Sequence, residues 1–189
     1  MTRDAVVLFL ALLALSAQVM VVGGIVAVGL RRSVVVFALG PLALAGAAAI
    51  AVTSTLGSLY LSEVAHFTPC RLCWYQRIAM YPLSVMLVVA AIRRDSAVRR
   101  YATPLAIIGA LIASYHVLLE RFPNLETSAC DPNNPCSLIW VKKFGYLTIP
   151  TMALTGFIGI LALLLVHRWS EISEIRVGHR SLSTEVSRA

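Results

Sequence analysis

The chain has 189 residues, of which 59% are hydrophobic and 13% are charged, and its mean hydropathy is +0.82. A water-soluble domain of this length could not bury so much apolar surface, so the composition excludes a soluble globular protein and indicates that the solvent is lipid. The formal net charge is +7, but the basic residues lie between apolar stretches instead of gathering in one segment, which argues against nucleic acid as a partner.

A helix that crosses a bilayer needs about 20 mostly apolar residues. Five stretches of the chain meet this requirement, at residues 5–30, 34–62, 74–92, 102–119 and 147–166. They predict an all-α membrane protein built as one compact bundle, without a separate soluble domain. The polar segment 169–189 is expected to be a solvated amphipathic or disordered end.

The basic residues predict how the chain crosses the membrane. Ten of the 16 follow the first stretch, separate the third from the fourth, or follow the fifth: Arg31, Arg32, Arg93, Arg94, Arg99, Arg100, Arg168, Arg176, Arg180 and Arg188. The other six are Arg3, Arg71, Arg77, Arg121, Lys142 and Lys143. Because cytoplasmic loops carry the excess of Lys and Arg, the C-terminus is expected in the cytoplasm. The N-terminus and the loops 63–73 and 120–146 are expected outside.

The first stretch has two interpretations. Arg3 precedes an apolar run with small residues at Ser16 and Ala17, a pattern that also occurs in secretory signal peptides. The run continues to Leu30, however, whereas the hydrophobic region of a signal peptide has about 7–15 residues. We therefore expect a retained membrane helix that packs against the bundle or a partner.

All four cysteines fall in or beside the two external loops, as the local pairs Cys70/Cys73 and Cys130/Cys136. External compartments are oxidising, so the spacing suggests one disulfide within each pair. A ring closed over two intervening residues stabilises a fold little, which favours redox chemistry over a structural role. Purely structural disulfides and a zinc site remain alternatives, although C-x5-C is loose spacing for zinc. The prolines and asparagines between Cys130 and Cys136 suggest an exposed loop that a protein thiol could reach.

The first pair immediately precedes the third apolar stretch, so Cys73 is expected near a helix N-terminus, where the helix dipole favours a thiolate. Arg77 follows one helical turn later, at a depth where a cation needs a partner. It is expected to stabilise the Cys73 thiolate or to bind an oxygen of a ligand. The alternative is that Arg77 extends its side chain to the lipid headgroups.

Three motifs in chain order give a resemblance to a known family. They are Cys70-Arg-Leu-Cys-Trp-Tyr-Gln-Arg77, Ser114-Tyr-His-Val-Leu-Leu-Glu120, and the segment from Cys130 through Cys136 to Pro150. The chain resembles the disulfide bond formation protein B (DsbB) family, in particular its short-loop branch from Gram-positive and related bacteria. The resemblance covers about residues 45–166.

This resemblance implies a four-helix bundle in a bacterial inner membrane. It implies oxidation of an extracytoplasmic thioredoxin-like (DsbA-like) thiol oxidase and transfer of the electrons to a membrane quinone, ubiquinone or menaquinone. By the same resemblance the partner attacks Cys130, Cys136 then attacks Cys70, and Cys73 becomes the thiolate that faces the quinone. Arg77, His116 and Gln76 are implied at the quinone site. For His116 and Gln76, hydrogen-bonded packing between helices is the alternative.

The chain departs from the family pattern by its first apolar stretch. We therefore expect an extra N-terminal helix with a basic turn over 1–33, a redox bundle over 34–168 and a polar tail over 169–189.

The vitamin K epoxide reductase-like family is a rival interpretation of the two cysteine pairs, but in that family the loop pair precedes the helix-end CxxC. A membrane reductant would be expected to carry its cysteines within the spans, and a non-enzymatic scaffold with structural disulfides is a further alternative. The apolar segment 138–144, with two lysines, is expected to lie at the membrane interface beside the second cysteine pair.

Overall fold

The computed structural model describes residues 3–29, 33–127, 130–131 and 133–186. Within these ranges the chain forms five α-helices: α1 (Arg3–Gly29), α2 (Ser33–Leu59), α3 (Arg71–Arg93), α4 (Arg99–Arg121) and α5 (Ile149–Val186). A π-helical turn, Tyr60–Val64, extends α2, and the two 3-10 turns Ser96–Val98 and Pro123–Leu125 flank α4. All five helices contain a segment long and apolar enough to cross a membrane, which confirms the all-α membrane fold.

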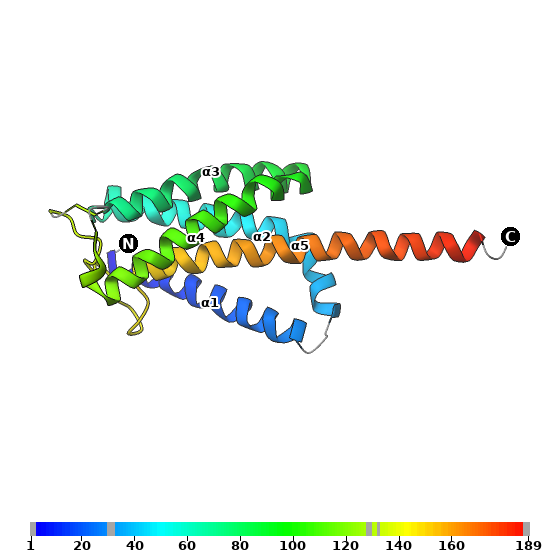
Figure 1. The fold of residues 1–189 in the computed structure, drawn as a ribbon, viewed down its shortest axis with the longest axis horizontal. Coiled ribbons are helices and arrows are strands. Elements are labelled where there is room, and N and C mark those ends of the chain that lie inside the picture. The colour runs from blue at the N-terminus through cyan, green and yellow to red at the C-terminus, as the bar shows by residue number, and fades with distance from the viewer. Residues whose placement is uncertain (1–2, 30–32, 128–129, 132, 187–189) are drawn as a thin grey trace.

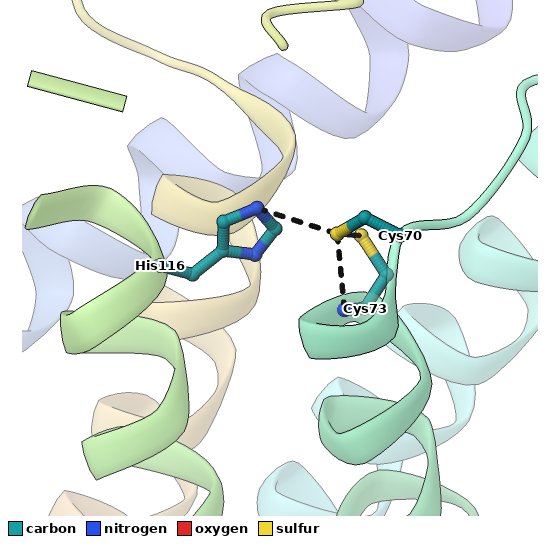
Figure 2. Close-up of side chains that lie close together, drawn as sticks. All are labelled: Cys70, Cys73 and His116. Atoms are coloured by element: carbon teal, nitrogen blue, oxygen red, sulfur yellow. Dashed lines mark hydrogen bonds between the residues drawn. The ribbon is translucent and has the colours of Figure 1, made fainter. Parts of the chain in front are cut away.

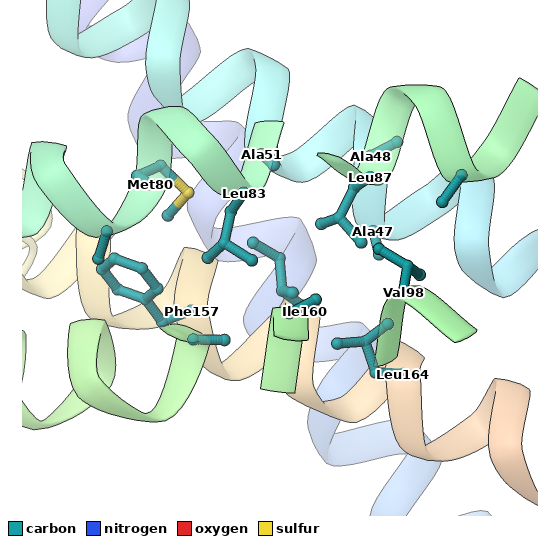
Figure 3. Close-up of a cluster of buried hydrophobic side chains, with 14 of the residues drawn as sticks. Ala47, Ala48, Ala51, Met80, Leu83, Leu87, Val98, Phe157, Ile160 and Leu164 are labelled. Atoms are coloured by element: carbon teal, nitrogen blue, oxygen red, sulfur yellow. The ribbon is translucent and has the colours of Figure 1, made fainter. Parts of the chain in front are cut away.

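Helices α2 to α5 form a four-helix bundle, and α1 is the extra helix that lies against α2 and α5 (Figure 1). The bundle core is made of small and aliphatic side chains between α2, α3, α4 and α5 (Figure 3). Gly109 shows how closely the helices approach, because a Cβ there would come within van der Waals overlap of the Phe157 ring. The core thus fixes the relative positions of the four helices that carry the functional residues.

Helix α1 is attached less closely than the others. It lies beside α5 at the cysteine end of the molecule and diverges from it toward its own C-terminal end (Figure 1). Near the close end, a Cβ on Gly57 of α2 would lie 2.9 Å from Leu10 of α1. Packing therefore holds α1 against α2 near the cysteine end of the molecule.

The two cysteine-bearing loops lie at the same end of the bundle, and the α3–α4 connection lies at the opposite end (Figure 1). This arrangement separates Arg93, Arg94, Arg99 and Arg100 from the cysteines by the length of the bundle. Arg99 forms an ion pair of 2.6 Å with Glu171 on α5. Arg31, Arg32 and Arg188, which contribute to the predicted topology, lie outside the described residues.

Local sequence explains where the helices begin and end. Cys70 is the N-cap of α3, and Arg94, with φ 54°, closes the same helix in the left-handed conformation. Helix α5 continues without interruption to Val186, so the polar tail is helical as far as that residue. Of the two alternatives expected for the tail, an amphipathic or a disordered end, the disordered one is therefore wrong for residues 169–186.

Candidate functional site

The first cysteine pair, Cys70 and Cys73, is called the inner pair here. Both are free thiols with their sulfur atoms 3.2 Å apart, so the disulfide that the sequence suggested is open in this structure (Figure 2). The Cys70 sulfur caps α3 by accepting the backbone N–H of Cys73 at 3.4 Å. The helix N-terminus therefore acts first on Cys70, one turn earlier than the sequence predicted.

His116, from α4, brings a nitrogen to this sulfur. Its Nε2 lies 3.6 Å from the Cys70 sulfur (Figure 2). The same nitrogen lies 3.0 Å from the backbone oxygen of Cys136. Its Nδ1 lies 3.0 Å from the side-chain nitrogen of Gln76 on α3. With the amide N–H₂ of Gln76 donating to Nδ1, Nε2 carries the proton and faces both Cys70 and Cys136. Both side chains are buried, and together they connect α3 to α4.

These contacts make Cys70 acidic. The hydrogen bond with the Cys73 thiol, followed by the hydrogen bond with His116, lowers the pKa of Cys70 to about 4, although burial opposes the shift. In the reduced inner pair these contacts favour the thiolate on Cys70. The expectation that Cys73 becomes the thiolate when Cys136 attacks Cys70 concerns a different state and stays a prediction. A thiolate on Cys70 stabilises the reduced form of the inner pair.

The second pair, Cys130 and Cys136, is called the loop pair, and it forms a disulfide in this structure. Glu126 orders the loop, because its carboxylate accepts the Cys136 N–H at 2.6 Å and the Ser137 hydroxyl at 3.0 Å. The side-chain amide of Asn134 donates to the carbonyl oxygen of Pro69, the residue before the inner pair. The two cysteine loops are therefore joined directly.

The loop disulfide is less accessible than the sequence suggested. Cys130 is 5% exposed and Cys136 is 1% exposed, and both pack in one cluster with Cys70 and Leu119. The loop consists of turns, as expected, but its sulfur atoms face the bundle. Access to the Cys130 sulfur therefore requires the loop to move.

Arg77 lies one turn below Cys73 on α3 and is 8% exposed. Its Nε donates to the Ser58 hydroxyl and one terminal nitrogen donates to the Ser58 carbonyl oxygen, both at 2.9 Å. Its guanidinium also lies 5.1 Å from the centre of the Trp74 ring. Arg77 is thus held inside the protein against α2, and the alternative in which it extends to the headgroups is wrong.

An apolar cavity of about 720 Å³ begins at these residues. Cys73, Gln76 and Arg77 line its outer end, and α1, α2 and α5 supply most of the remaining lining. Cys70 and His116 instead line a small neighbouring cavity that also contains Glu120. Of the residues predicted at a quinone site, Gln76 and Arg77 therefore line the large cavity, whereas His116 contacts the cysteines.

Three donor atoms of Cys70, Cys73 and His116 lie within 4.8 Å of one another, as a metal site would require. Among the described residues no fourth histidine, cysteine or carboxylate joins this group, and His116 is shared with the Cys136 carbonyl. A closed structural zinc site has four ligands, so the arrangement fits thiol exchange better than zinc.

Sequence reasoning missed Ser58, Glu126 and Asn134 as functional residues. Each is an ordinary polar residue whose partner is 10 to 65 positions away along the chain. The sequence indicated Ser58 only weakly, by its position as a polar residue near the outer end of a mostly apolar stretch. The π-helical turn that follows it, a feature frequent at functional sites, is not visible in the sequence.

The fold and these two cysteine pairs define the class of membrane thiol–disulfide oxidoreductases. The family model described as disulfide bond formation protein DsbB matches residues 40–167, more than half of the chain. The chain belongs to the DsbB family. The match begins at residue 40, so α1 lies outside it.

Individual relatives agree with this family. The chain is 45% identical over 113 residues to disulfide bond formation protein C of Bacillus subtilis, a match that covers 59% of this chain and 82% of the relative. It is 42% identical over 118 residues to a probable disulfide formation protein of Coxiella burnetii, covering 61% and 76%. No solved structure matches the chain significantly. The protein is thus a multi-pass membrane protein that acts in disulfide bond formation, and the family favours this over the vitamin K epoxide reductase-like and scaffold alternatives.

Proposed function

We propose that the protein re-oxidises an extracytoplasmic thioredoxin-like (DsbA-like) thiol oxidase and passes the electrons to a membrane quinone, ubiquinone or menaquinone. The observation that carries this proposal is the position of the inner pair. Its Cys70 contacts the loop pair through His116, and its Cys73 lies at the end of an apolar cavity beside Arg77.

The first exchange takes place at the loop pair. A thiolate of the reduced partner attacks the Cys130 sulfur, the Cys130–Cys136 bond breaks, and Cys136 leaves as a thiolate. The partner's second thiol then attacks the mixed disulfide, which releases the partner in oxidised form. Two electrons and two protons have moved from the partner to the loop cysteines.

The second exchange passes this reduction to the inner pair. The Cys136 thiolate attacks Cys70 of an oxidised Cys70–Cys73 bond, Cys73 leaves as a thiolate, and Cys130 resolves the mixed disulfide. The products are a closed loop disulfide and a reduced inner pair, which is the oxidation state of the four cysteines in this structure. His116 supports this step, since its Nε2 contacts both the Cys70 sulfur and the Cys136 backbone.

The residues at the cavity end fit a quinone. Arg77 offers cationic N–H donors inside an otherwise apolar space, with Gln76 beside it, as a buried ligand with carbonyl oxygens requires. When bound there, a quinone supplies a two-electron, two-proton acceptor for the inner pair. Arg77 is held by Ser58 and does not depend on the ligand for its position.

We further propose that both cysteine pairs face the outside of a bacterial inner membrane, with the C-terminus in the cytoplasm. The distribution of Arg and Lys supports this orientation. A membrane-impermeant thiol reagent, applied to intact cells after reduction, should label Cys130 and Cys136. Labelling of these two only from the cytoplasmic side would invert the orientation.

The function is tested with a partner that lacks its second, resolving cysteine. Such a partner cannot complete the first exchange, so a mixed disulfide should accumulate, and mass spectrometry should find the partner on Cys130 with Cys136 free or joined to Cys70. Linkage mainly through Cys136 or Cys70 would overturn the assigned roles. Failure of the reduced, unmodified partner to change the absorbance of added quinone would overturn the proposed electron transfer.

A further inference from the structure

The large cavity is closed on one side by α1, the helix that precedes the part matched by the family model. Residues of α1 line it from Leu10 to Gly24, and those between include the small side chains Ala14 and Ala17. On the facing side the lining comes mainly from α2 and α5. We name the cavity-lining face of α1 between Leu10 and Gly24 the α1 wall.

The cavity is too long for a quinone ring alone. Along α5 its lining runs from Ile149 beside the cysteines to Trp169, and 20 residues of α-helix span about 30 Å. This is about the thickness of the hydrocarbon core of a bilayer. A ring near Arg77 would occupy only the outer end, and the remaining lining is mostly apolar, with the hydroxyl residues Ser16, Thr53, Ser54 and Thr155 among it. The space suits a long hydrocarbon chain attached to that ring.

Gln18 fixes α1 in this position. Its side-chain nitrogen donates to the Thr155 hydroxyl on α5 at 2.9 Å, and its side-chain oxygen accepts the Tyr146 hydroxyl at 2.7 Å. A polar side chain inside a membrane span is costly unless it is paired, and here both ends of the amide have partners. Gln18 does not line the cavity itself, so it acts as a positioning residue for the α1 wall.

We propose that the α1 wall encloses the isoprenoid tail of the quinone and that Gln18 holds the wall in place. The inference rests on the proposed quinone reduction and goes beyond it, because α1 lies outside the matched family segment. The isoprenoid tail is favoured over a lipid acyl chain because the cavity is continuous with the redox end at Cys73 and Arg77. A lipid acyl chain is the competing occupant that the experiment must distinguish.

The first measurement uses the unmodified chain. A quinone with a photoreactive group in its isoprenoid tail is bound to the purified protein and activated, and the protein is cleaved after arginine. Cleavage at Arg3 and Arg31 releases residues 4–31, which contain the whole α1 wall. We expect the label on this peptide, and we expect unlabelled long-tailed quinone, but not excess phospholipid, to compete for it.

The second measurement compares two substitutions on α1. Ala17→Phe places a ring in the cavity, whereas Val19→Phe places it on a side that is 66% exposed and does not line the cavity. The preference for long-tailed over tailless quinone, measured as a ratio of dissociation constants, should fall about tenfold in Ala17→Phe and stay at the wild-type value in Val19→Phe. Gln18→Leu should lower the same ratio. Thermal unfolding shows whether each variant is folded.

The outcomes separate this inference from the function on which it rests. If the wild-type protein binds and reduces quinone but residues 4–31 carry no label, or if phospholipid displaces the label, the α1 wall does not enclose the tail. Equal ratios in folded Ala17→Phe and Val19→Phe would overturn it as well. If the wild-type protein neither binds nor reduces any quinone, the proposed function itself fails.

Discussion

The inner pair and the loop pair each consist of two cysteine sulfur atoms, but the two pairs are suited to different tasks. This difference in role comes from the backbone that carries each pair. The inner pair lies at the first turn of a helix, where Cys70 receives a backbone N–H and the contact of His116. The loop pair lies in a segment of turns held by the side chain of Glu126. A helix fixes charge and position, whereas a loop held by few bonds can open. One pair is thus suited to a fixed ligand and the other to a visiting protein.

The largest effect on turnover is expected when one sulfur is removed from either pair, and it tests whether the two pairs have separate tasks. Cys73→Ser and Cys136→Ser should each reduce turnover by about 10³-fold or more, because each removes a reacting atom. The two variants should differ in whether they can still oxidise the partner in a single turnover. Cys73→Ser keeps the loop disulfide and should still oxidise the partner once, whereas Cys136→Ser should not. A single-turnover assay of partner oxidation measures this, and equal loss in both variants would remove the distinction between the pairs.

Arg77→Ala should affect the inner pair only. We expect a loss of about 10- to 100-fold in the apparent affinity for quinone or in the rate of its reduction, because a buried cation with fixed donors is removed. Exchange between the partner and the loop pair should change much less. Arg77→Lys is the matched control, since it keeps the charge but not the paired donors to Ser58. An unchanged dependence of turnover on quinone concentration would contradict this role.

Glu126→Ala should affect the loop pair only. It leaves the Cys136 N–H without its carboxylate partner, and a lost buried hydrogen bond costs about 1–3 kcal/mol. The loop should open more often, so a small dithiol should reduce the Cys130–Cys136 bond about tenfold faster. Glu126→Gln keeps an oxygen acceptor, so its rate of disulfide reduction should lie between the rates of the wild-type protein and Glu126→Ala. A rate unaffected by either substitution would show that Glu126 does not control opening.

The smallest expected effect is a shift in the pH at which Cys70 loses its thiolate. With its pKa lowered to about 4, the reduced inner pair should keep a thiolate down to that pH and lose it below. Thiolate absorbance is measured in a variant with Cys130→Ser and Cys136→Ser, which leaves the inner pair alone. His116→Phe should raise the midpoint by about one unit, because it removes one favourable contact. His167→Phe, in the middle of α5 and beside Glu171, should leave the midpoint unchanged, and a shift in that variant would indicate a nonspecific effect.

The sequence predicted the helices and the cysteine positions well, because both follow from local patterns. Runs of apolar residues placed each span, and chain order alone placed both pairs at one end of the bundle. The contacts of Ser58 and Asn134 were not predictable, since they depend on how α2 and the loop approach α3. Burial of the loop disulfide was missed for the same reason. A turn rich in proline and asparagine is usually exposed, and only its tertiary contacts bury it here.

The buried loop disulfide has a consequence for the cell. Electrons that enter this protein are drawn into the respiratory chain if the proposed function holds, so indiscriminate entry would drain every small thiol in the surrounding fluid. With Cys130 only 5% exposed, a small thiol has little access to its sulfur atom. Under the proposed function, a protein that binds and displaces the loop would reach Cys130 more readily than a free metabolite thiol would. Under the proposed function, the loop would thus select which thiols can deliver electrons to the membrane.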